Sequence, residues 1–165
     1  MATICLVTPG HLGSNPRIVK EADALVNQGH RVHVVYAQTH PRDLDRDASI
    51  LNTARWKAHA VFGLVGSPAH RLRRLRQLAA AATFRHWFQS LHLAIIAQHQ
   101  LAICLRRTVC RIPADLYIAH YVAALPAAAA AADRHNSTYA FDAEDFHSGE
   151  WPDSVEYDSY RHLIR

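Results

Sequence analysis

The densest group of chemically versatile side chains lies in the segment FDAEDFHSGE. Its acids and its histidine are Asp142, Glu144, Asp145, His147 and Glu150. Carboxylates and an imidazole at this spacing can bind a metal ion, share a proton or hydrogen-bond sugar hydroxyls. No second His or Cys stands at standard zinc spacing, so we expect no metal site. A capped acidic loop without chemistry remains the structural alternative.

A second candidate is the segment PGHLGSNPR at residues 9–17, between an apolar run and an amphipathic stretch. Its candidate ligands are Gly10, His11, Gly13, Asn15 and Arg17. Backbone N–H groups at a helix N-terminus attract anions, and glycines let a ligand approach the backbone. The two glycines are spaced GxxG, and no acid follows the second predicted strand, which argues against a dinucleotide fingerprint. A phosphate or substrate loop is expected, with a plain turn as the alternative.

His120 stands directly after the apolar run DLYIA, at the end of a predicted strand. A lone histidine is often structural, and this chain has 13 of them. The position at the end of a strand favours a functional role as strongly as a structural one.

The segment HRLRRLRQL at residues 70–78 carries arginines beside leucines at a period of three. The arginines are Arg71, Arg73, Arg74 and Arg76, and the leucines are Leu72, Leu75 and Leu78. On a helix, this pattern suits contact with an anionic membrane surface. The alternative is a solvated helix that docks its leucines on the sheet. Without interleaved aromatics or a known motif, we expect no nucleic-acid partner.

The charges along the chain are strongly segregated. Between Asp47 and Asp115 there is no carboxylate but ten Lys and Arg residues, whereas residues 115–165 hold nine acids and three arginines. A basic middle and an acidic end indicate two surfaces with different partners.

The hydrophobic periodicity predicts alternating strands and helices. Strands are expected at residues 3–8, 31–37, within 50–64, at 115–119 and at 138–142. Helices are expected at residues 16–28, from 70 to about 107 with a break near 82–83, and at 123–134. Residues 40–48 are expected to form a polar loop. Asn15 suits the N-cap of the first helix, Pro16 its first position and Gly29 its end.

This order predicts a three-layer, doubly wound (Rossmann-like) α/β domain with strand order 3-2-1-4-5. Ligands bind such sheets beyond the carboxyl ends of the strands, where the strand order reverses. We therefore expect the 9–17 loop, His120 and the 142–147 segment to meet at one cleft.

The size of 165 residues fits one domain with a substantial core. No apolar run is long enough to span a bilayer, and the N-terminus lacks the features of a signal peptide. Cys5 and Cys104 fall in apolar segments and read as buried thiols. We expect a cytoplasmic protein, peripheral at the inner face of a membrane if the basic helix binds lipid.

Three blocks of the sequence resemble the N-terminal domain of family 4-like glycosyltransferases with the GT-B fold. They are VTPGHLGSNPRIVKEADALVNQGHRVHVV, ADLYIAHYVAALPAA and YAFDAEDFHSGE, in that order, and the resemblance runs from about residue 3 to 150. It implies retaining transfer of a sugar from a nucleotide sugar to an acceptor, without metal or other cofactor. The acceptor would be a glycan, a lipid-linked sugar or a small molecule.

The resemblance also implies roles for the candidate residues. The 9–17 loop would lie near the donor phosphates, and His120 beside the reacting sugar; Glu144, Asp145 and His147 would line the cleft. A basic helix, as at residues 71–76, occurs in members that act on lipid acceptors.

The chain departs from the family in one large respect. It stops at Arg165, before the second Rossmann-like domain that would bind most of the donor. Residues 1–150 are therefore expected to be the acceptor-side domain and residues 151–165 the start of a bridge, inactive alone.

Two other classes of function stay open from sequence. One is a non-catalytic module that docks on a partner or an anionic membrane through the basic stretch. The other is a small metal-dependent hydrolase built on residues 142–147.

Overall fold

Five short apolar runs form one parallel sheet in the computed structural model, which describes residues 1–143. The strands are β1 (Thr3–Val7), β2 (Arg31–Gln38), β3 (Lys57–Phe62), β4 (Leu116–His120) and β5 (Thr138–Asp142). They are ordered β3-β2-β1-β4-β5, and every neighbouring pair is parallel. The predicted strand order and the doubly wound α/β class are confirmed.

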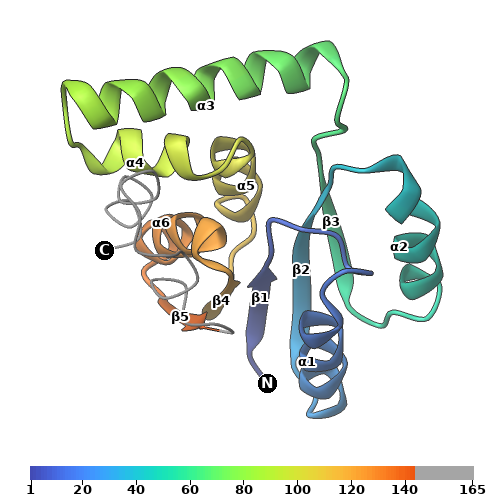
Figure 1. Cartoon of the computed structure of the whole chain (residues 1–165). Coiled ribbons are helices and arrows are strands. Elements are labelled where there is room, and N and C mark those ends of the chain that lie inside the picture. Colours follow the sequence, from blue (N-terminus) through green and yellow to red (C-terminus); the bar gives the residue numbers. More distant parts are fainter. Residues whose placement is uncertain (144–165) are drawn as a thin grey trace.

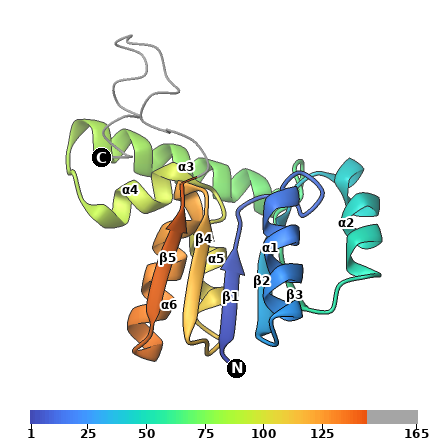
Figure 2. The same ribbon diagram turned by 90° about the horizontal axis from the view of Figure 1, so that it is seen from below.

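Helices cover both faces of this sheet, as Figures 1 and 2 show. They are α1 (Pro16–Asn27), α2 (Leu44–Leu51), α3 (Pro68–His86), α4 (Leu91–Gln98), α5 (Ala102–Val109) and α6 (Leu125–His135), with single 3-10 turns η1 (Pro41–Asp43) and η2 (Val122–Ala124). In Figure 2, α1 lies on one face, and α5 and α6 lie on the other. The α3–α4 pair lies at the carboxyl-end side of the strands.

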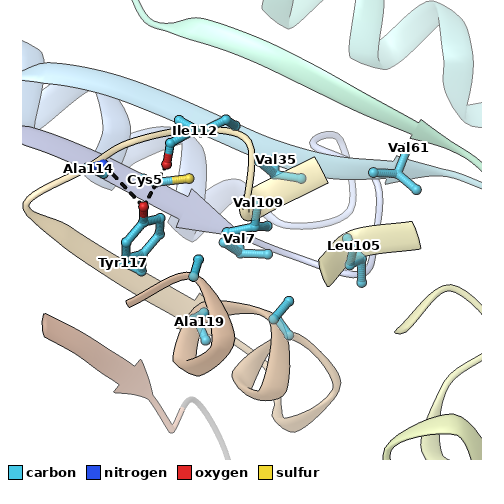
Figure 3. Packing of buried hydrophobic residues seen from close by; sticks show 14 of the residues in the cluster. Cys5, Val7, Val35, Val61, Leu105, Val109, Ile112, Ala114, Tyr117 and Ala119 are labelled. Carbon is cyan, nitrogen blue, oxygen red and sulfur yellow. Dashed lines mark hydrogen bonds between the residues drawn. The ribbon is translucent and has the colours of Figure 1, made fainter. Parts of the chain in front are cut away.

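Side chains alternate along each strand and so build two cores. On the α1 side, Leu6, Val34 and Tyr36 pack against Ile18 and neighbouring residues. On the α5 and α6 side, strand residues pack against α5 and the alanines of α6 (Figure 3). Because alanine side chains are small, α6 can lie close to the sheet.

Tyr117 illustrates how the second core satisfies a buried polar group. Its ring has no exposed surface, and its hydroxyl donates to the Ile112 carbonyl at 2.6 Å and accepts from the Ala114 N–H at 3.1 Å (Figure 3). These two bonds hold the loop before β4 against the core. Burial raises the pKa of the Tyr117 hydroxyl, so the phenol stays protonated.

Two sequence predictions about the helices are wrong. Residues 40–48 are not a loop, because η1 and the first half of α2 occupy them. Leu51 and Ile50 of α2 pack on the α1-side core, which stabilises this short helix despite its polar composition.

The stretch from 70 to 107 is three helices rather than one with a break at 82–83. α3 continues through that point, and the chain turns at residues 87–90 and again at 99–101. Ser90 caps α4 by accepting a hydrogen bond from the Leu93 N–H. The turn at 87–90 lets α4 pack back on α3.

The cysteines are free thiols. Cys5 has no exposed surface, as predicted, and burial raises its pKa to about 12. Cys104 is half-buried against the α5-side core. No helix in residues 1–143 is long and apolar enough to cross a membrane.

Candidate functional site

Three segments that are distant in sequence meet at the carboxyl ends of β4 and β5. Asp142 ends β5, and its carboxylate lies 3.4 Å from Nδ1 of His120 at the end of β4. The other oxygen of Asp142 accepts from Nη1 of Arg17, in the first turn of α1, at 3.5 Å. The predicted meeting of the first loop–helix segment, β4 and β5 is observed here.

Strand alternation decides where the His120 ring points. Tyr117 and Ala119 belong to the α5-side core, so His120 faces α1. Its Nε2 lies 2.7 Å from a carboxylate oxygen of Glu21, and the ring has no exposed surface. The two ring nitrogens therefore face two different carboxylates.

Glu21 is a site residue that the sequence reasoning missed. It lies one helical turn after Arg17, at the i,i+4 spacing that places both side chains on one face of α1. Since Arg17 was already a candidate, this spacing could have identified Glu21. Its side chain and that of Asp142 are each about one-third exposed, at 31% and 30%.

Glu21, His120 and Asp142 bring three possible metal-ligand atoms within 4.8 Å of one another. The two carboxylates, however, lie closest to opposite nitrogens of one ring. A single ion can bind only one of these nitrogens, so the arrangement fits a carboxylate–imidazole–carboxylate hydrogen-bond chain better than a metal centre.

The loop between β1 and α1 is held by contacts that sequence did not indicate. His11 Nδ1 lies 2.6 Å from Asp47, and His11 Nε2 accepts from the N–H groups of Thr39 and His40 at 2.8 and 3.0 Å. Because Nε2 is an acceptor, Nδ1 carries the proton and donates it to Asp47. Both ring nitrogens are thus used within the protein.

Other predicted donors of this loop are also engaged internally. The Gly13 N–H donates to Asp47 at 3.0 Å, and the Gly10 N–H donates to the Thr8 hydroxyl at 3.3 Å. Asn15 is the N-cap of α1, as predicted, accepting from the Ile18 N–H. A Cβ at Gly13 would lie 2.6 Å from Cδ of Arg46, so only glycine fits without a shift of α2 side chains.

The structure therefore gives the loop residues different positions from those expected of a phosphate cradle. His11 and Asn15 are buried, each 3% exposed. Arg17, whose side chain is 57% exposed, can reach a ligand directly. The loop differs from the expectation because α2, a helix that was not predicted from the sequence, places Asp47 against it.

The basic segment forms the first half of α3. Arg71, Arg74 and Arg76 are exposed, whereas Arg73 is half-buried with its Nε shielded from solvent. At 100° per residue, Arg73 lies on the same side as Gln77, whose side-chain amide donates to the Ala97 carbonyl of α4.

The leucines of α3 do not dock on the sheet. Leu72, Leu75 and Leu78 are 70%, 65% and 50% exposed, because α3 packs against α4 rather than the sheet. The alternative of a sheet-docking leucine row is therefore wrong.

Three predicted site residues, Glu144, Asp145 and His147, lie outside the described residues. Among the acids and the histidine of that segment, only Asp142 belongs to the described residues, and it lies in the site.

Comparisons with known proteins give a structural likeness without a sequence family. No protein-family model matches the chain, and no curated protein matches it either. Among solved structures, the chain is similar to the crystal structure of CalG4, the calicheamicin glycosyltransferase, at 14% sequence identity and a TM-score of 0.46. The match covers 86% of this chain and 32% of that one, so the chain spans about a third of the length of CalG4.

Proposed function

We propose that residues 1–150 are the acceptor-side domain of a retaining glycosyltransferase that uses a nucleotide sugar. The observation that carries the proposal is the contact of Arg17, Glu21, His120 and Asp142 at the point where the strand order reverses. Ligands bind doubly wound sheets at this point. The three sequence blocks that resemble family 4-like enzymes contain all four residues.

In this proposal each group has a defined task. The exposed guanidinium of Arg17 stabilises negative charge on the departing phosphate. The partly exposed carboxylates of Glu21 and Asp142 accept hydrogen bonds from sugar hydroxyls. Glu144, Asp145 and His147, which lie outside the described residues, are proposed to contribute to sugar binding, and neither metal nor cofactor takes part.

His120 acts indirectly, because its ring is buried between the two carboxylates. A neutral imidazole donates to one carboxylate and a protonated imidazole donates to both. His120 thereby fixes the separation and orientation of Glu21 and Asp142, which must be held to within about 0.5 Å for efficient catalysis.

The test is a sugar-transfer assay in which a donor-binding domain is supplied in trans or as a fusion. We expect His120→Ala, Arg17→Ala and Glu144→Ala each to lower the transfer rate by about 100-fold. The exposed His86 provides a control, and His86→Ala should retain the full rate. Unchanged rates in the three site variants would refute this assignment.

A second function, docking on the anionic inner face of a membrane, is favoured by the exposed surface of α3. Leu72, Leu75 and Leu78 form an outward row, and Arg74 and Arg76 lie about 100° to either side of Leu75. An apolar stripe between cations matches the acyl and phosphate layers of a bilayer. Such docking would bring a lipid-linked acceptor toward the carboxyl ends of the strands.

A further inference from the structure

A cavity of about 590 Å³ lies on the outer side of α5, away from the His120 site. It is lined by His92, Ile103, Arg106, Arg107, Cys110, Arg111 and Arg134. The α5 residues among them recur at spacings of three and four and so form one stripe of the helix. The cavity and the His120 site lie on opposite sides of the sheet, because His120 faces α1.

Among residues 1–143, four guanidinium groups and no carboxylate line this cavity. Arg106, Arg107, Arg111 and Arg134 are all exposed, and none forms an ion pair or side-chain hydrogen bond with another residue in the described part of the chain. Four like charges at one cavity repel each other and concentrate positive potential there. A bound anion would relieve this repulsion.

The ends of two helices account for part of the cluster but not for all of it. Arg106 and Arg107 lie in the last turn of α5, and Arg134 lies in the last turn of α6, where the helix dipole favours cations. The helix dipole stabilises each of these cations by about 0.3–1 kcal/mol, but it does not neutralise their charges. Arg111 lies beyond the end of α5.

We infer that this pocket binds an anion that carries a phosphomonoester or diphosphate group. Planar guanidinium groups bind phosphate oxygens through paired, charge-assisted hydrogen bonds. The cavity volume falls in the range of about 300–1,000 Å³ that small-molecule sites occupy. This binding is independent of the function proposed above, because it uses none of the residues of the His120 site.

Calorimetric titration with pyrophosphate, using the whole 165-residue chain at low salt, tests the inference. We expect the double variant Arg106→Ala/Arg134→Ala to bind at least about tenfold more weakly than the wild type. Arg42→Ala removes an exposed arginine of η1 outside the pocket and should bind like the wild type. Equal affinity in the wild type and the double variant would overturn the proposal, with circular dichroism confirming that both are folded.

Cys110 provides a readout at the pocket itself. Cys104 and Cys110 are both half-buried and both pack against the α5-side core, but only Cys110 lines the cavity. An occupied pocket should slow alkylation of Cys110 and leave the rate at Cys104 unchanged, as measured by mass spectrometry of peptides.

The same alkylation assay distinguishes the two sources of the phosphate group. Protection by pyrophosphate assigns a soluble phosphate ester as the ligand. Protection that appears only with vesicles of equimolar phosphatidylcholine and phosphatidic acid, and not with phosphatidylcholine alone, assigns a lipid headgroup. Absence of protection by either probe would overturn the proposal.

Discussion

At the scale of single residues, Asp47 holds the loop that leads into α1. It has no exposed surface, and its two oxygens accept from the His11 ring and the Gly13 N–H. His11 then accepts from two backbone N–H groups after β2. A single buried carboxylate thus fixes the loop on which the position of Arg17 depends.

We predict that Asp47→Ala lowers the free energy of unfolding by about 3 kcal/mol, because it leaves the His11 and Gly13 donors buried without acceptors. The matched control is Asp45→Ala, an exposed carboxylate of the same helix, which should change it by less than about 0.5 kcal/mol. Urea unfolding measures both. Similar midpoints for the two variants would contradict the prediction.

The site was only partly predictable at this scale. Arg17, His120 and Asp142 follow from their positions at strand and helix ends. Asp47 does not, because it lies in a polar stretch that gives no sign of burial, and its partner His11 is distant in sequence. Glu21 could have been identified from its i,i+4 spacing to Arg17, but its contact with His120 is known only from the structure.

At the scale of secondary-structure elements, α3 differs from the other long helices in what it leaves uncovered. α1 buries Ile18 and Ala22, whereas the leucine row of α3 remains in solvent. The adjoining turn exposes Trp87 and Phe88, at 79% and 67%. Aromatic residues of this kind are enriched where proteins meet the membrane–water interface.

We predict that replacing Leu72, Leu75 and Leu78 together by serine abolishes binding to anionic vesicles without lowering stability. The three side chains are at least half exposed, so folding gains little from them. Vesicle flotation and thermal unfolding measure the two properties.

Phe62→Ser serves as the control for this experiment, since Phe62 is 68% exposed on β3 rather than α3. It should leave vesicle binding intact. If the triple variant still floats with anionic vesicles, or if binding does not depend on lipid charge, the docking proposal is wrong.

The strands were predicted from the sequence more accurately than the helices. Four strands, β1, β2, β4 and β5, were predicted close to their observed bounds, whereas β3 was expected only somewhere within residues 50–64. The 70–107 region was not resolved into three helices, because alanine and arginine favour helix throughout and the turns form where α4 packs on α3.

At the scale of the whole molecule, stability should depend on pH through a pair of histidines on β2 and β3. Nδ1 of His33 lies 2.9 Å from Nε2 of His59, and the rings stack at 5.1 Å. Burial lowers the pKa of each ring below its ordinary value of 6.5, and the charges of Lys57 and Arg31 lower that of His33 further. Both rings therefore bind protons less readily in the folded protein than in the unfolded chain.

We predict that the free energy of unfolding falls as the pH drops below about 6.5, because the unfolded chain then binds protons that the folded protein excludes. His59→Gln should reduce this dependence, whereas His86→Gln, at an exposed position, should not. Urea unfolding between about pH 7 and pH 5 provides the measurement. An unchanged slope in His59→Gln would show that the pair does not contribute.

The position of β5 has a consequence for how the protein behaves at high concentration. β5 pairs with β4 on one side only, and no other strand in residues 1–143 continues the sheet beyond it. Its first three residues, Thr138, Tyr139 and Ala140, are exposed. Amide and carbonyl groups along this margin are therefore a template for another strand, and a second molecule could add to the sheet there. Self-association that begins at β5 would grow with protein concentration.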